Sequence, residues 1–213
     1  MFGLNGTFDE SELAIKPTPE MDSIGPTEIT METFVENGSP VLGNPNASIT
    51  LVEFGDYQCH YCHVFFESIE GKIMKNYIET GKVKMIFKDY NIIGKDSVKA
   101  SQGAHCANDQ GLFWEYHDIL YSNWTGENNG WASGANLANY AQDIGLEMNQ
   151  WTDCMSQQKH SKTILDSNED AKKLQLTGTP AFFVISSDGQ VSKLFGAQPF
   201  EVFERVFNEK LEN

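Results

Sequence analysis

The chain has 213 residues, of which 40% are hydrophobic and 12% aromatic, and this is enough to bury one sizeable core. Its formal net charge of -15 argues against nucleic acid as a partner and against electrostatic adhesion to an anionic membrane, because both would repel it. Its four cysteines, an even number, fit an oxidising compartment.

Residues 1–26 are polar, contain prolines and show no sustained period, which predicts a tail or linker. They hold neither a leader-like apolar segment nor a run long enough to span a bilayer. We interpret them as what remains below a removed leader or anchor. This interpretation places the protein outside the cytoplasm, in a periplasm-like space or at the cell surface.

The first structural signals lie between residues 29 and 90. Residues 29–35 are predicted to be extended, and residues 49–54 alternate as a strand does. The spacing of Cys62, Phe66, Ile69 and Ile73 then predicts one face of a helix. A second alternating strand is predicted over 83–90. The order strand, helix, strand implies a parallel pair with a right-handed crossover.

The segment Cys59-His60-Tyr61-Cys62-His63 stands where the first strand passes into that helix. Cys59 falls in the first turn, where unpaired backbone N–H groups and the helix dipole stabilise a thiolate. Cys62 falls on the buried face. Cys59 is therefore the expected attacking thiol and Cys62 the resolving thiol, and His60, when protonated, would lower the pKa of Cys59 further.

Three other interpretations of these five residues stay open at this point. They match the attachment signature of a c-type haem. Cys59 and Cys62, with His60 or His63, also offer ligands to zinc or copper. The third alternative is a structural disulfide that closes a very small loop.

Residues 96–176 have helical character and almost no strand signal. Asp96 is a plausible N-cap, and the four tryptophans all lie here, where we expect them to fill the core. Cys106 and Cys154 also fall in this stretch, and a structural disulfide is the expected role, since neither opens a helix beside another thiol. Such a bridge would contribute about 4 kcal/mol in the loop-length model. Two free buried thiols are the alternative.

The end of the chain returns to strands. Residues 181–185 are apolar, Asp188-Gly189 signals a hairpin turn, residues 191–195 form the return strand, and Pro199 opens a last amphipathic helix. Gly178-Thr179-Pro180 stands directly before the apolar strand. A proline there lacks the N–H group that would donate a hydrogen bond within the sheet, and the peptide bond before it can be cis.

Taken together, these segments resemble the DsbA-like branch of the thioredoxin superfamily from about Ile29 to the C-terminus. Glu53-Phe54, six residues before the first cysteine, resembles the family's buried acid. Cys59 to Cys62 resembles its active site, Thr179-Pro180 its cis-proline loop, and residues 107–117 a helix of its insertion. Relatives also carry a second disulfide at positions like those of Cys106 and Cys154.

The resemblance implies an α/β thioredoxin fold, a central mixed β-sheet flanked by helices, with an inserted all-helical subdomain. The expected divisions are a tail over 1–26, the first part of the thioredoxin-like domain over 27–95, the insertion over 96–176, and the second part over 177–213.

The implied activity is that of a protein disulfide oxidoreductase, which uses a redox-active disulfide and no other cofactor. Its expected partners are reduced or unfolded exported proteins, held against Thr179 and Pro180, and a membrane reoxidase linked to quinone. We expect a monomer. Zinc or copper remains the alternative cofactor, and haem a distant one.

Three residues of the predicted site carry alternatives of their own. The best-known members have Pro-His between the cysteines, whereas this chain has His60-Tyr61, so either residue could tune the site. Glu53 is expected to shuttle a proton at Cys62, or else to reach solvent or Lys88. His63 is expected on the helix surface beside Glu67 and Glu70, with metal binding as its alternative.

Overall fold

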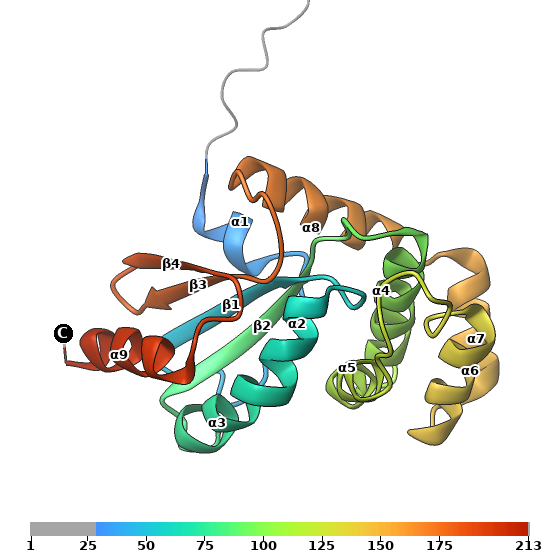
Figure 1. Cartoon of the computed structure of the whole chain (residues 1–213), viewed down its shortest axis with the longest axis horizontal. Coiled ribbons are helices and arrows are strands. Elements are labelled where there is room, and N and C mark those ends of the chain that lie inside the picture. Colours follow the sequence, from blue (N-terminus) through green and yellow to red (C-terminus); the bar gives the residue numbers. More distant parts are fainter. Residues whose placement is uncertain (1–28, 213) are drawn as a thin grey trace, which may run out of the picture.

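The structure is a computed structural model and describes residues 29–212 (Figure 1). The tail predicted for residues 1–26 lies outside the described residues. In chain order the elements are α1 (Met31–Val35), β1 (Ile49–Gly55), α2 (His60–Phe65), η1 (Phe66–Glu70), α3 (Gly71–Ile73), η2 (Met74–Ile78), β2 (Val83–Asp89), α4 (Lys95–Asn108), α5 (Phe113–Ser122), α6 (Gly134–Asp143), α7 (Met148–Gln157), α8 (Ser161–Lys173), β3 (Ala181–Ser186), β4 (Val191–Phe195) and α9 (Phe200–Leu211). Within residues 29–212, no helix combines the length and the apolarity needed to cross a bilayer.

The four strands form one mixed sheet in the order β2-β1-β3-β4. β1 and β2 are parallel, as the strand-helix-strand order predicted, whereas β3 runs antiparallel to both β1 and β4. In this register Glu53 of β1 lies between Phe87 of β2 and Phe182 of β3. The central sheet and its flanking helices confirm the predicted fold class.

Both faces of the sheet are covered because side chains alternate along each strand. Leu51 and Phe182 point toward α9, where Phe203 packs against them. Val52 and Phe183 point to the other face, where α1 and α8 lie. Figure 1 shows these two layers, with α4–α7 grouped beside the sheet.

The helical stretch between β2 and β3 builds a core of its own, which also reaches the cysteine segment. Tyr116, Leu137 and Trp151 share one buried cluster with Cys59 and Cys62. α8, the last helix of this stretch, also packs on the sheet through Ala171 and Leu174. The redox segment therefore lies at the junction of the sheet and the helices.

Two local predictions were wrong. Residues 31–35 are helical rather than extended, because the side chain of Thr33 accepts a hydrogen bond from the Thr30 backbone and closes the first turn. Gly94, not Asp96, caps α4, and Asp96 instead pairs with Lys99 at 2.8 Å within the first turn.

Candidate redox site

The turn that carries the cysteines is fixed by one buried carboxylate, that of Asp56. Its Oδ1 accepts the backbone N–H of Gln58 at 2.9 Å. Its Oδ2 accepts the N–H groups of Ile92 and Ile93, at 2.8 and 2.9 Å, from the loop after β2. Asp56 thus ties the end of β1 to its parallel neighbour and sets where α2 begins.

Cys59 is the N-cap of α2 and is only 4% exposed. A hydrogen bond from the Cys62 thiol, with the backbone N–H groups of Cys62 and Tyr61, lowers the pKa of Cys59 to about 6, although burial acts against this. These donors lie at the start of a helix, where N–H groups have no partner within the helix. Cys59 therefore carries a stabilised thiolate near neutral pH.

Cys62 is also buried, but its thiol is far less acidic than that of Cys59. It lies one turn into α2 and is almost fully buried. Burial, and then the nearby Cys59, raises the pKa of Cys62 well above its ordinary value. Neither cysteine is held in a disulfide in this structure, and the pair consists of one acidic and one shielded sulfur.

The loop before β3 faces this pair. The Cys59 thiol donates to the backbone carbonyl of Thr179 at 3.3 Å, and the Thr179–Pro180 peptide bond is cis. The Pro180 carbonyl accepts the N–H of Gly196 at 2.8 Å, which fastens the loop to the end of β4. The structure thus brings the predicted Cys59, Cys62, Thr179 and Pro180 together.

Glu53 lies in the middle of β1 and is 1% exposed. Neither of its carboxylate oxygens has a hydrogen-bond partner among the described residues. Burial, and then the charges of Glu70 and Cys59, raises its pKa well above its ordinary value. The alternative prediction, a contact with solvent or Lys88, was wrong, because Lys88 pairs with Asp170 at 2.8 Å.

The remaining predicted residues lie on the outer side of the site. Tyr61 is 61% exposed, and its ring contacts that of His60. The His60 backbone N–H donates to the Glu127 carboxylate at 3.0 Å. The His63 ring stacks on Trp124 with centroids 4.5 Å apart.

Sequence reasoning missed the position of Trp124, which it assigned to the core. The residue follows α5, and its indole N–H donates to the carbonyl of Gln58 at 2.9 Å, directly before Cys59. Because Trp124 lies in a loop, helical periodicity held no signal for its place. It forms part of the wall around the cysteines.

The expected surface position of Glu70, beside His63, was also wrong. Glu70 is buried and lies 3.8 Å from His117 of α5. Its spacing of four residues from Phe66 and three from Ile73 is that of the buried face, which the sequence could have revealed.

The ligand set of the metal alternative does not come together in the described part of the chain. That part of the chain contains two clusters in which three ligand atoms lie within 4.8 Å of one another. One consists of Asp109, Cys154 and His160, and the other of Glu70, His117 and Asp118. Neither group contains a residue of the Cys59–His63 segment.

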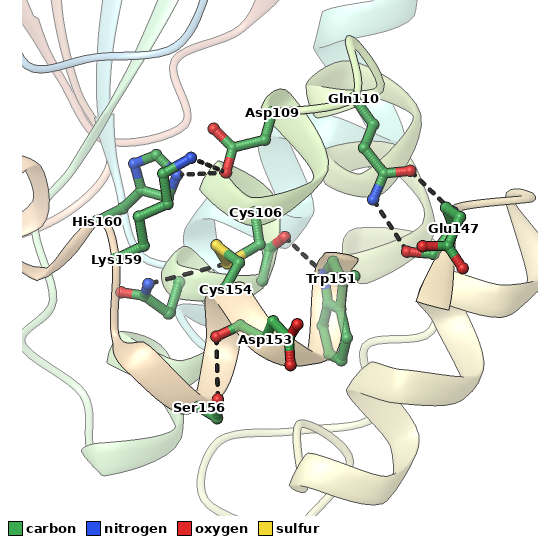
Figure 2. The surroundings of a disulfide bond; sticks show 12 residues. Cys106, Asp109, Gln110, Glu147, Trp151, Asp153, Cys154, Ser156, Lys159 and His160 are labelled. Carbon is green, nitrogen blue, oxygen red and sulfur yellow. Dashed lines mark hydrogen bonds and ion pairs between the residues drawn. A yellow bond between two sulfur atoms is a disulfide. The ribbon is translucent and has the colours of Figure 1, made fainter. Parts of the chain in front are cut away.

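The other two cysteines form a disulfide between α4 and α7, Cys106 to Cys154 (Figure 2). Trp151, one turn earlier on α7, donates its indole N–H to the Gly103 carbonyl of α4 at 3.1 Å. The bridge lies inside the helical stretch and joins two helices that already pack together.

Paired thiols of unequal acidity at a helix start exchange disulfides with other thiols, and the class of protein that this fold and site define is the thiol-disulfide oxidoreductases. A family model described as Thioredoxin matches residues 36–192. The chain therefore belongs to the thioredoxin family and, within it, is a DsbA-like protein disulfide oxidoreductase.

Similar proteins carry matching names. "Probable disulfide bond formation protein D" of Bacillus anthracis is 27% identical over 157 residues, 72% of each chain. "Disulfide bond formation protein D" of Bacillus subtilis is 28% identical over 150 residues, 69% of this chain and 68% of the relative. The crystal structure of oxidised BdbD from Bacillus subtilis superposes with a TM-score of 0.73 at 25% identity, covering 82% of this chain and 94% of that one.

Proposed function

We propose that this chain oxidises thiols of exported proteins, with Cys59 as the sulfur that substrates attack. The observation that carries the proposal is the low pKa of Cys59, about 6, beside the raised pKa of Cys62. A stabilised Cys59 thiolate favours the reduced form of the pair and so makes the disulfide a strong oxidant. It also makes Cys59 a good leaving group.

The reaction has two exchange steps. A substrate thiolate attacks Sγ of Cys59, a mixed disulfide forms, the Cys59–Cys62 bond breaks, and Cys62 leaves as a thiolate. A second substrate thiolate then attacks the substrate sulfur of the mixed disulfide, and Cys59 leaves as a thiolate. The substrate loses two electrons and gains a disulfide, while the enzyme pair is reduced.

Glu53 is proposed to supply the proton that the departing Cys62 needs. The raised pKa of its carboxyl keeps that proton on Glu53 under conditions where an exposed glutamate has lost it. A negative charge on Glu53 also contributes to the raised pKa of Cys62, so the protonation states of the two groups are coupled. Glu53 has no competing hydrogen-bond partner among the described residues.

Substrates are proposed to lie in extended form along the backbone before Pro180. The Thr179 carbonyl at 3.3 Å from Sγ of Cys59 supports this, since an extended peptide paired there would bring its own cysteine to the reacting sulfur. His60 and Tyr61, on the exposed side of α2, would contact the neighbouring substrate residues.

We place the protein outside the cytoplasm. The relatives named for disulfide bond formation support this, because disulfides persist in oxidising compartments, as does the Cys106–Cys154 bridge. Repeated turnover requires a reoxidant, for which we propose a membrane enzyme linked to quinone.

The test is the equilibrium of the pair against a graded glutathione buffer, with thiols trapped and assigned by mass spectrometry. A reversible transition of Cys59 and Cys62 at a potential close to that of strong oxidants supports the proposal, whereas a low, thioredoxin-like potential points to a reductant. Cys62→Ser, mixed with an unfolded protein that carries a disulfide, should accumulate a mixed disulfide, because the Cys59 thiolate breaks the substrate disulfide and no second enzyme thiol is present to resolve it. Cys59→Ser should form none, and a mixed disulfide through Cys62 would overturn the assigned order of attack.

A further inference from the structure

A buried polar cluster that the exchange reaction does not use lies behind the redox helix. Glu70 reaches it from η1, and His117 and Asp118 reach it from α5. The His117 side chain is fully buried and the Glu70 side chain is 7% exposed, whereas Asp118 lies at the surface. One ligand atom from each of the three residues lies within 4.8 Å of the other two.

Two atoms at the centre of this cluster have no hydrogen-bond partner among the described residues. They are Nε2 of His117 and Oε2 of Glu70, and both are buried. They face each other at 3.8 Å, which is too long for a hydrogen bond. Leaving such groups unsatisfied is costly, so native structures seldom contain a pair of them without a further partner.

The other ring nitrogen of His117 is held from outside the cluster. Nδ1 lies 3.2 Å from the hydroxyl group of Tyr57, itself fully buried. With Nδ1 donating its proton to that hydroxyl oxygen, Nε2 presents a free lone pair on the side of Glu70. Metal-binding histidines are oriented in this way, by a hydrogen bond at the nitrogen that does not bind the metal.

The second group of ligand-capable residues shows what a satisfied cluster looks like. Asp109 accepts from Lys159 at 2.8 Å and lies 3.1 Å from Nε2 of His160, while the sulfur of Cys154 is held in the disulfide (Figure 2). Its polar atoms already have partners. The Glu70–His117–Asp118 cluster differs because Nε2 of His117 and Oε2 of Glu70, at its centre, have no hydrogen-bond partner in the described part of the chain.

We propose that Glu70, His117 and Asp118 form a binding site for a divalent transition-metal ion of the zinc class. One imidazole nitrogen and two carboxylate oxygens form a donor set that suits zinc, and three protein ligands leave a fourth position for water. Asp118, at the surface, gives the ion a way in. The site uses neither Cys59 nor Cys62. It therefore does not depend on whether that pair oxidises or reduces its substrates.

The experiment uses the full chain with all four cysteines in disulfides, so that no thiolate competes for the metal. The oxidised protein is dialysed against Zn²⁺ in chelator-free buffer and the bound metal is determined by elemental analysis. We expect stoichiometric zinc that is lost in His117→Gln, and a rise in Kd of about tenfold or more in Asp118→Asn. Co²⁺ in place of Zn²⁺ should give the visible absorption of a low-coordinate nitrogen and oxygen site, absent from Glu70→Gln.

The matched control is His160→Gln. It removes an imidazole that also lies near a carboxylate, that of Asp109, but outside the proposed site, so it should leave zinc binding unchanged. Zinc that persists in both His117→Gln and Asp118→Asn, or no stoichiometric zinc in the parent protein, would overturn the proposal. If His117→Gln does not fold, the surface variant Asp118→Asn decides the question alone, because unchanged affinity there removes Asp118 from the site.

Discussion

Sγ of Cys59 lies 3.3 Å from the carbonyl oxygen of Thr179, although 120 positions separate the two residues in the sequence. They meet because β1 and β3 are neighbours in the sheet, so the end of β1 and the start of β3 share one edge. A carbonyl oxygen can only accept a hydrogen bond, so a Cys59 thiolate is stabilised by other groups, which are the Cys62 thiol, the Thr179 side chain and the backbone N–H groups at the start of α2.

Cys62→Ala should raise the pKa of Cys59 from its value of about 6, because the Cys62 thiol is the largest single cause of that low value. The thiolate absorbance in the ultraviolet, followed against pH in the reduced protein, measures the change. His60→Gln is the matched control and should leave the midpoint nearly where it is because, contrary to the expectation from the sequence, His60 is not among the causes of the low pKa of Cys59. An unchanged midpoint in Cys62→Ala would assign the low pKa of Cys59 to the Thr179 side chain and the backbone N–H groups.

Glu53→Gln should slow the exchange steps in which Cys62 gains or loses a proton, by about tenfold to a thousandfold as is usual for general acid-base groups. The rate of reoxidation of the reduced pair, followed against pH, measures this effect. The attack of small thiol reagents on Cys59 is the internal control and should change little. Equal rates for Glu53→Gln and the parent protein at every pH would remove the proton-transfer role.

Glu53→Gln should also change how stability depends on pH. The pKa of Glu53 is raised well above its ordinary value of 4.5, so above that pH the folded protein keeps a proton that the unfolded chain loses. The free energy of unfolding of the parent protein therefore falls as the pH rises from about 4.5 toward the folded-state pKa. Urea unfolding at a series of pH values should show a shallower decline in Glu53→Gln, and parallel curves would contradict the prediction.

Replacing Cys106 and Cys154 together by alanine should lower the free energy of unfolding by about 4 kcal/mol, since their bridge closes a loop with a sequence separation of 48. Denaturant unfolding under non-reducing conditions measures the loss. The glutathione equilibrium of Cys59 and Cys62 should stay the same. A shifted potential would mean that the bridge also acts on the redox pair.

Lys88→Met should destabilise the fold by about 3 kcal/mol, because it leaves Asp170 without its buried partner at 2.8 Å. Lys88 also donates to the Thr33 carbonyl at 2.9 Å and so holds α1 on the sheet. The double variant Lys88→Met with Asp170→Leu should recover part of the loss. A double variant as unstable as the sum of the two singles would show that the two side chains do not interact.

Much of the fold could be predicted because its signals are local. The strands of residues 49–55, 83–89, 181–186 and 191–195 have alternating or continuous apolar patterns between clear turn residues, and all four are present in the structure. α1 escaped prediction because five residues are too few to show a helical period. Its short capping hydrogen bond and its place on the sheet decide its conformation.

The sequence by itself determined the redox pair. Cys59 and Cys62 stand a fixed distance apart where a strand passes into a helix, and the unequal surroundings of the two sulfurs follow from that local geometry. The position of Pro180, directly before an apolar strand, can likewise be seen from the neighbouring residues in the sequence. These features depend on neighbours within a few residues, which a sequence displays directly.

Only the tertiary structure decided which distant side chains meet. Packing pairs Lys88 with Asp170 and leaves the Glu53 carboxylate without a hydrogen-bond partner among residues 29–212. It also stacks Trp124 on His63 and brings Glu70 within 3.8 Å of His117. Each of these contacts joins elements that are separated in the chain and brought together by packing. Spacing along the sequence fixes the direction of a side chain, but not what lies opposite it once the layers have closed.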